Sequence, residues 1–199
     1  MSENQNLLLG ICGSPRQQGT EYAVQYALKY AADKFEFETE YWSVGKKELK
    51  FCIHCDYCIR EKKGCIHKDD IQELYPKLET ARFLLFGTPV FQGTLSGQIK
   101  TVMDRCRAMV AKNPEVFKNK IGMALAVGGD RSGGQEIAIR SILDFFQQNH
   151  IITVSGGAFG SNLGAALWSD DRGKEGVSND AEGLKAIRKV IKRANEFKI

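Results

Sequence analysis

Four of the six cysteines of this chain lie in one short polar segment with the spacing C-x2-C-x2-C-x6-C. They are Cys52, Cys55, Cys58 and Cys65. Gaps of two residues allow consecutive thiolates to turn toward one small inorganic core, and Gly64 provides a bend before the fourth cysteine. The spacing therefore predicts that these cysteines hold a 4Fe-4S cluster.

Other uses of the cysteine segment remain open. His54 and His67 could supply nitrogen ligands to zinc, although structural zinc prefers two C-x2-C pairs separated by a longer arm. A redox-active dithiol and free thiols are further alternatives.

The N-terminal residues lack the basic and apolar regions of a signal peptide, so we expect a cytoplasmic protein. In that reducing compartment, clustered cysteines serve as ligands or redox groups more often than as disulfides.

Length and composition indicate one globular domain spanning residues 1–199, because a chain of this size can bury a sizeable core. Hydrophobic residues make up 43% and charged residues 26% of the chain, and no apolar run reaches the ~18 residues of a membrane helix. The net charge of +4 is modest and spread along the chain, which argues against a nucleic-acid-binding surface.

The elements that must position these residues follow an alternating pattern. Apolar or alternating runs predict five strands, at 7–12, 37–43, 81–87, 121–127 and 151–154. Helical spacing follows at 23–31, 69–78, 98–109, 139–146 and 184–197, with Cys106 on the core side of its helix. Asp69 is expected to cap the second of these helices, and Pro76 to strain its middle. Residues 156–183 are expected to form a glycine-rich, polar excursion.

This alternation predicts a doubly wound α/β fold with a five-stranded parallel sheet in the order 2-1-3-4-5. The cysteine-rich segment, at about 46–68, would be an insertion after strand 2. In that strand order a crevice opens beyond the carboxyl ends of strands 1 and 3. We therefore expect the loops after strands 1, 3 and 4 to meet at one binding site.

The first of these loops has the groups of an anion site. Ser14 and Thr20 supply hydroxyl donors, Arg16 supplies positive charge, and Gly19 exposes backbone N–H groups at a helix N-terminus. The loop has neither the Gly-Lys-Ser/Thr of a nucleoside triphosphate site nor G-x-G-x-x-G, so a monophosphate fits best. An ordinary turn with a helix cap would explain the same residues.

The other two loops could contact a flat heteroaromatic ring. The second contains Pro89, Val90, Phe91, Gln92 and Gly93, and the third contains Gly128, Gly129, Asp130, Arg131 and Gly134. Arg131 could face an electron-rich carbonyl of the ring. Individually, Phe91 could be a core residue and the third loop a surface turn. Together, one phosphate site and two ring-contacting loops describe an FMN pocket.

Three stretches of the sequence resemble a known family. They are Gly13-Ser-Pro-Arg16, Thr88-Pro-Val-Phe-Gln-Gly93 with Ser96-Gly97 and Lys100 to Arg105, and Val127-Gly-Gly-Asp-Arg-Ser-Gly-Gly-Gln-Glu136. They are similar to the NADPH-dependent FMN reductase branch of the flavodoxin-like proteins. With the cysteine segment, the chain resembles the iron-sulfur flavoproteins from about residue 7 to its last helix.

The resemblance implies FMN held by the three loops and a 4Fe-4S cluster held by the four cysteines. It also implies a homodimer or homotetramer in which the cluster and flavin of different subunits approach each other. Electrons would come from ferredoxin or a similar carrier and pass to a small acceptor such as oxygen, peroxide or a quinone. The family phosphate loop reads Ser-x-Arg-x-x-Gly-Asn-Thr, whereas Thr20 and Glu21 occupy the last two positions here.

Those two positions affect the expected site. A carboxylate is unfavourable beside a phosphate, so we leave Glu21 out of the phosphate site. Gln18 is included as a contact whose position the family pattern does not fix.

The expected activity is that of an FMN-dependent oxidoreductase that transfers electrons. No Ser-His-Asp or paired-carboxylate arrangement is visible, so we assign no catalytic acid or base. Arg60, Lys62 and Lys63 could offset the charge of a cluster or could simply be solvated. The alternatives are a flavin-only NAD(P)H-dependent FMN or quinone reductase with structural or zinc-binding cysteines, and a zinc-bearing interaction module.

Overall fold

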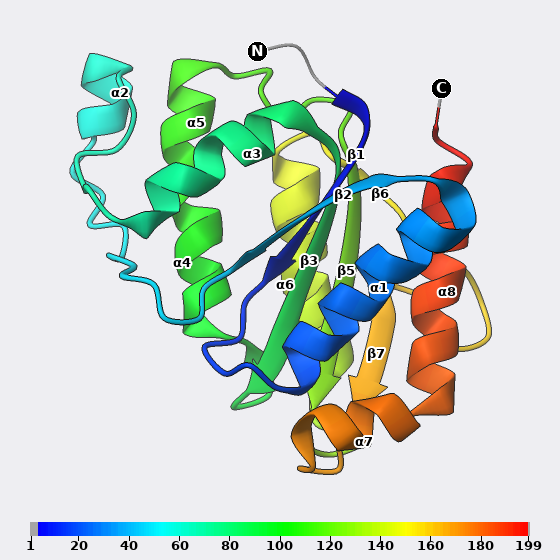
Figure 1. The fold of residues 1–199 in the computed structure, drawn as a ribbon. Coiled ribbons are helices and arrows are strands. Elements are labelled where there is room, and N and C mark those ends of the chain that lie inside the picture. Colours follow the sequence, from blue (N-terminus) through cyan, green and yellow to red (C-terminus); the bar gives the residue numbers. More distant parts are fainter. Residues whose placement is uncertain (1–3, 199) are drawn as a thin grey trace.

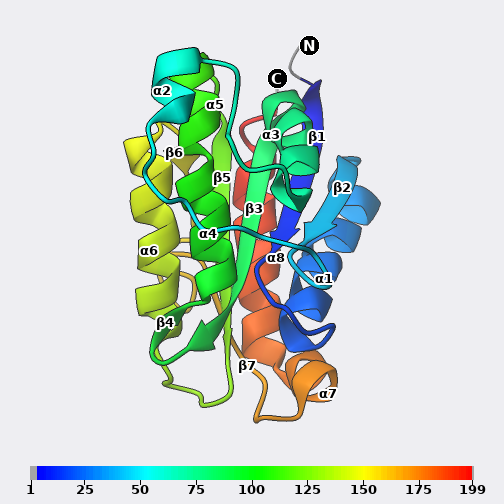
Figure 2. The same cartoon turned by 90° about the vertical axis from the view of Figure 1, so that its left-hand side faces the viewer.

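The computed structural model describes residues 4–198 as three layers, with a parallel sheet between two layers of helices (Figures 1 and 2). The strands are β1 (Asn4–Cys12), β2 (Glu38–Ser43), β3 (Ala81–Phe91), β4 (Thr94–Leu95), β5 (Ile121–Gly128), β6 (Ile152–Thr153) and β7 (Ala165–Trp168). The helices are α1 (Gly19–Phe35), α2 (Tyr57–Glu61), the 3-10 helix η1 (Asp70–Glu73), α3 (Leu74–Thr80), α4 (Gly97–Arg105), α5 (Arg107–Lys112), α6 (Gln135–Gln148), α7 (Gly173–Asn179) and α8 (Ala181–Asn195). None of the helices within residues 4–198 is long and apolar enough to cross a membrane.

The sheet has the flavodoxin-like order, but the predicted strand count was wrong. Its main path in the described part of the chain is β2-β1-β3-β5-β6, and β4 and β7 bring the total to seven strands. β6 pairs with the beginning of β5 and β7 with its end, so two short strands share the position expected for one. Residues 156–183, predicted as a polar excursion, contain β7 and α7 as well as loops.

Alternate residues of the central strands enter two separate cores. In β1, Leu9 and Ile11 face the side covered by α3, α4, α5 and α6, while Leu8 and Cys12 face the side covered by α1 and α8. β3 repeats this alternation, so its side chains are buried on both faces, as parallel strands require.

A short hairpin lengthens β3 beyond its predicted end. β3 continues to Phe91, and Gln92 and Gly93 turn the chain into β4, which pairs antiparallel with β3. Both turn residues have positive φ, at 48° and 82°. This is the backbone of a two-residue hairpin turn, and it explains a glycine at the second position.

Two expectations for the helix after the cysteine segment need correction. Asp69 is the N-cap residue of η1, as predicted, but its side chain makes no capping hydrogen bond and pairs with Arg105 of α4. Pro76 lies in the first turn of α3, where its missing N–H costs no hydrogen bond. The predicted core position of Cys106 is confirmed, and this residue separates α4 from α5. Burial raises the pKa of the Cys106 thiol to about 12, which keeps it protonated.

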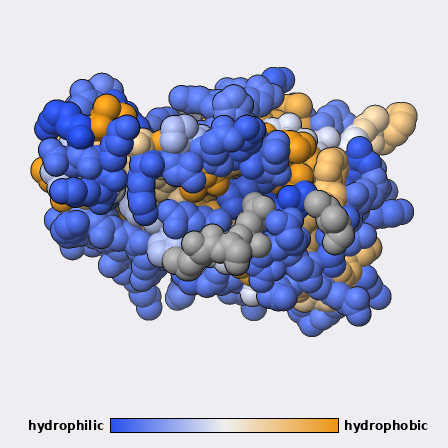
Figure 3. Space-filling view, turned by 90° about the horizontal axis from the view of Figure 1, so that it is seen from above, coloured by the Kyte–Doolittle hydropathy of each residue, from blue (hydrophilic) through white to orange (hydrophobic). Residues whose placement is uncertain are grey.

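The segment with the four cysteines lies between β2 and η1 and contains α2. After β2 the chain runs along α4, and α2 then packs against α5. Figures 1 and 2 place α2 at the end of the molecule opposite α7. Figure 3 looks onto that end, where apolar patches interrupt a mostly hydrophilic surface. Phe51, Ile53, Ile59 and Ile66 of the segment are all exposed.

Candidate functional site

A cavity of about 690 Å³ lies at the carboxyl end of the sheet. It is within the 300–1,000 Å³ range typical of small-molecule sites. The loop after β1, the end of β3, the end of β5 and the segment between β7 and α7 all contribute to its wall. The lining residues are Ser14, Arg16, Gln18, Gly19, Thr20, Pro89, Val90, Phe91, Val127, Gly129, Ser169, Asp171, Arg172 and Gly173.

The loop after β1 brings its predicted anion-binding groups to this cavity. The hydroxyl of Ser14 donates to the carbonyl of Arg16 at 2.9 Å and accepts from the Arg16 N–H at 3.2 Å, which fixes a tight turn. α1 begins at Gly19, so its free backbone N–H groups face the same space. Ser14 and Thr20 are buried, while Arg16 is exposed and free to reach an anion.

Glu21 is directed away from the anion-binding loop. Its carboxylate accepts a hydrogen bond from the Tyr41 hydroxyl of β2 at 3.1 Å. The negative charge is therefore held against the neighbouring strand, and the unusual residue at this position does not oppose an anion at the helix N-terminus. Burial raises the pKa of Tyr41, so its hydroxyl stays protonated and can donate to Glu21.

The second loop contributes three of its five predicted residues to the cavity wall. Pro89, Val90 and Phe91 line the cavity, whereas Gln92 and Gly93 form the hairpin turn and do not. The side chains of Val90 and Phe91 are half-buried, which leaves apolar surface available to a ring. Gln92 and Gly93 act on the site only through the hairpin that they form.

Only Gly129 of the third loop lines the cavity; Gly128, Asp130, Arg131 and Gly134 do not. The Gln135 side chain holds this loop closed, because it donates to the carbonyl of Asp130 at 2.6 Å and accepts from the Gly133 N–H at 2.9 Å. The Arg131 guanidinium lies 4.2 Å above the ring of Trp168. It therefore stacks on an aromatic side chain at the end of β7.

The segment after β7 adds residues that the sequence analysis did not predict. Ser169, Asp171, Arg172 and Gly173 line the cavity, and Arg172 pairs with Asp170 at 3.0 Å. Arg172 is thus a second arginine beside the N-terminus of α1. In the sequence, Arg172 and Gly173 lie at the start of a helix, as Arg16 and Gly19 do in the first loop. This similarity was the signal that could have identified the segment.

The four cysteines are near each other in sequence but are not gathered around a common centre. Cys52 and Cys55 are exposed, and Cys58 and Cys65 are half-buried. Within residues 4–198, no group of three or more His, Cys, Asp or Glu side chains could hold a metal ion as placed. Four thiols in one short segment are the donors that an iron-sulfur cluster takes, so the donor chemistry fits while the positions do not show a formed site.

Two arginines hold the cysteine segment locally. Arg60 donates to the carbonyl of Cys55 at 2.9 Å, and Arg107 of α5 donates to the Asp56 carboxylate at 2.6 Å. The hydrogen bond from Arg107 lowers the pKa of the Asp56 carboxyl. The backbone has φ of 99° at Gly64, so the bend predicted before Cys65 is present.

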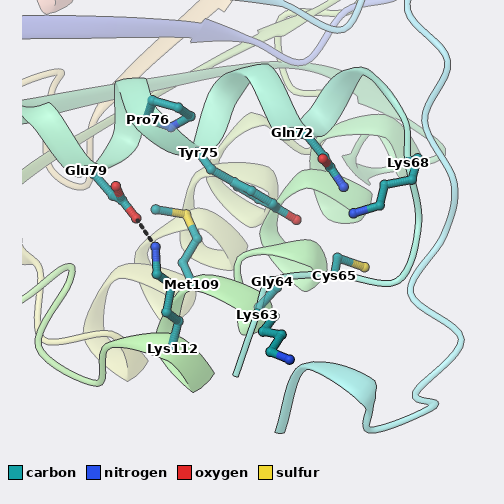
Figure 4. Close-up of a pocket in the computed structure, with 11 residues that line it drawn as sticks. Lys63, Gly64, Cys65, Lys68, Gln72, Tyr75, Pro76, Glu79, Met109 and Lys112 are labelled. Carbon is teal, nitrogen blue, oxygen red and sulfur yellow. Dashed lines mark ion pairs between the residues drawn. The ribbon is translucent and has the colours of Figure 1, made fainter. Parts of the chain in front are cut away.

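A second, smaller cavity of about 320 Å³ adjoins Cys65, between α3 and α5 (Figure 4). The ring of Tyr75 extends from α3 across the cavity, with Cys65 and Lys68 at one end and an ion pair between Glu79 and Lys112 at the other. This cavity is far smaller than the one at the carboxyl end of the sheet.

Comparison with known proteins identifies the family. The model of the NADPH-dependent FMN reductase family matches residues 7–166. The chain belongs to this family. An iron-sulfur flavoprotein of Methanocaldococcus jannaschii is 58% identical over 189 residues, which cover 95% of each chain. An iron-sulfur flavoprotein of Archaeoglobus fulgidus is 50% identical over 191 residues, covering 96% of each. The protein is therefore an FMN-dependent oxidoreductase of the iron-sulfur flavoprotein group.

A solved structure supports the fold of this family member. The crystal structure of RosB with a bound riboflavin-phosphate intermediate has a TM-score of 0.73 and 16% sequence identity to this chain. The similarity covers 96% of this chain and 78% of RosB. At that identity it shows the flavodoxin-like fold alone.

Proposed function

We propose that FMN binds in the 690 Å³ cavity with its phosphate at the N-terminus of α1. The observation that carries this assignment is that four loops converge there and join an anion-binding helix end to apolar surface. Ser14, Thr20 and the backbone N–H groups of α1 would hold the phosphate, and Arg16 would neutralise it. Val90 and Phe91 would lie along the ring, with Gly129 close to its edge.

We further propose that Cys52, Cys55, Cys58 and Cys65 hold a 4Fe-4S cluster when it is supplied. The donor set supports this assignment, as do the names of the relatives. A cluster of this type passes single electrons and FMN takes up one or two, so together they join a one-electron donor to a two-electron acceptor. The role of the cysteine segment is to hold the cluster near the protein surface.

The separation of the two sites suggests how electrons would cross between them. α2 of the cysteine segment lies at the end of the molecule opposite the proposed FMN cavity (Figure 1). The segment begins closer to the cavity, because Phe51 lines a pocket together with Pro15 of the first loop. A homodimer or homotetramer would shorten the path of the electrons if the cysteine segment of one subunit approached the cavity of another. The exposed apolar residues of the segment, Phe51 and Ile53 among them, fit a protein contact of that kind.

Ferredoxin or a similar carrier is the donor that we propose, and oxygen, peroxide or a quinone the acceptor. Arg60, Lys62 and Lys63 are exposed beside the cysteines and offer positive charge to an acidic carrier. Six free cysteines and a cluster sensitive to oxygen fit a cytoplasmic location. A flavin-only reductase is the second candidate, favoured by the name of the family model and by the ungathered cysteines.

Anaerobic rapid mixing distinguishes the two candidates. The protein loaded with FMN and iron is mixed with reduced ferredoxin or with NADPH, and bleaching of the flavin absorbance is followed. The electron-transfer proposal predicts fast bleaching by ferredoxin and slow bleaching by NADPH. Fast bleaching by NADPH alone, unchanged when the four cysteines are replaced by serine, would establish the flavin-only reductase instead.

A further inference from the structure

A buried ion pair joins α4 to the chain beside the cysteine segment. The guanidinium of Arg105 donates to both carboxylate oxygens of Asp69, at 2.6 and 3.0 Å, and both side chains are completely buried. Burial lowers the pKa of the Arg105 guanidinium, but Asp69 and Tyr75 are the main groups that raise it, and they outweigh burial. Arg105 is therefore a fixed positive charge close to one of the four cysteines.

The same guanidinium also binds the other end of the segment. Its Nη1 donates to the carbonyl of Lys50 at 2.6 Å, and the Lys50 N–H donates to the Asp69 carboxylate at 2.8 Å. Glu48 and Asp70 add two hydrogen bonds beside this network, of 2.8 and 3.2 Å. Lys50 lies just before Cys52, and Asp69 lies just after Cys65, so the network closes the loop that contains all four cysteines.

A role in stability alone does not account for this arrangement. A buried ion pair is often no more stabilising than apolar residues of similar size, because both charges lose their hydration. What apolar residues cannot do is donate to the Lys50 carbonyl, as Arg105 does, and accept from the Lys50 N–H, as Asp69 does. Closing the loop in advance removes part of the entropy that the segment would lose on gathering its cysteines.

We propose that Arg105 is a positioning residue for the cysteine segment. It fixes both ends of the loop to α4 so that Cys52, Cys55, Cys58 and Cys65 start from a closed loop when they bind iron. The iron-binding part of this inference rests on the proposed function, whereas the closure of the loop does not. Arg107, whose ion pair with Asp56 is partly exposed, holds the middle of the segment more weakly.

Hydrogen exchange of the metal-free protein tests the closure directly. Arg105→Lys keeps the positive charge but loses the planar fork that donates to the Lys50 carbonyl and to both Asp69 carboxylate oxygens. The Lys50 amide should exchange on the order of 100-fold faster in this variant than in the parent, since a broken buried pair opens the loop. Asp104→Asn is the matched control, because Asp104 belongs to an exposed pair with Lys100 on the same helix. It should leave the Lys50 amide unchanged.

Iron loading tests the consequence for the cysteines. Each variant is reconstituted anaerobically with iron and sulfide, and bound iron, labile sulfide and FMN are measured per chain. Arg105→Lys should lose iron and sulfide yet retain FMN, while Asp104→Asn retains all three. Bound FMN shows that the fold is intact, because its proposed site lies at the far end of the sheet. If Arg105→Lys does not fold, Asp69→Asn takes its place, and it should likewise lose iron and sulfide and retain FMN.

The outcomes separate this inference from the proposed function. Unchanged exchange of the Lys50 amide in Arg105→Lys would overturn the closure. Faster exchange with a full complement of iron would overturn the positioning role. If the parent protein takes up no iron, the proposed cluster fails, and faster exchange then supports the closure of the loop on its own.

Discussion

Gly134 and Gly93 meet where the third loop touches the β3–β4 hairpin, and replacing each by alanine tests how that contact supports the cavity. Both have positive φ, at 110° and 82°. A Cβ on Gly134 would lie 2.4 Å from the carbonyl oxygen of Gly93, whereas a Cβ on Gly93 would have no atom within 4 Å. Gly93→Ala therefore adds only backbone strain. Alanine also makes the unfolded chain less flexible, which partly offsets this strain, so we expect a net loss of ~1 kcal/mol in the free energy of unfolding.

Gly134→Ala adds a steric clash to the same backbone strain. Two backbones must separate by about 1 Å to restore normal contact, and overpacking of this kind costs ~1–3 kcal/mol more. We expect a total of ~3 kcal/mol, or a fall in Tm of roughly 10 °C, against roughly 3 °C for Gly93→Ala. The displaced hairpin carries Phe91, so FMN affinity should fall in Gly134→Ala alone.

Calorimetry of the metal-free protein and FMN titration of each variant provide the two measurements. Equal, small changes in Tm for both variants would refute the reasoning, because the strain is shared and only the contact differs. A large loss of stability in Gly134→Ala without any loss of FMN affinity would separate the hairpin from the site.

Three further predictions concern the two sites and the ion pair. Arg16→Ala should weaken FMN by ~10- to 100-fold and riboflavin hardly at all, as a charge-assisted bond to phosphate is lost; equal weakening in fluorescence titrations would remove Arg16 from the phosphate site. Cys58→Ala should abolish iron binding and leave FMN stoichiometry intact; loss of both cofactors from a folded variant would show that the sites depend on each other. Burial raises the pKa of the Asp69 carboxyl, but Arg105 and the Lys50 N–H lower it more, so the folded protein holds this pKa below its ordinary value of 3.8. The ionised carboxylate therefore stabilises the fold above pH 3.8, and this stability is lost as the pH falls below that value. Urea unfolding at several pH values should show this loss in the parent and not in Asp69→Asn.

The sheet order could be predicted because it depends on local pattern and on general rules of connection. Apolar runs such as 81–87 and 121–127 identify buried strands, and right-handed crossovers restrict how they can be arranged. β7 was missed because its four residues are flanked by glycines and polar residues, and its strand character depends on pairing with β5. β4 was missed because a two-residue strand has no recognisable period.

The candidate site was predictable where one loop carries its own chemistry, as at 14–20. The contribution of 169–173 was not, because these residues reach the cavity only through the pairing of β7 with β5. Likewise, Asp69 has the sequence signature of a helix cap, and only the three-dimensional position of Arg105 explains its different role. A carboxylate beside a buried guanidinium is stabilised more by that charge than by a helix N-terminus.

The central claim is that one chain carries both FMN and a 4Fe-4S cluster. An absorption spectrum of the protein purified without oxygen, combined with iron, labile-sulfide and FMN analysis, tests it most directly. The account predicts FMN near one per chain, iron and sulfide near four each per chain, and broad cluster absorbance beneath the flavin bands. Stoichiometric FMN with zinc or no metal in the cysteine segment would contradict it.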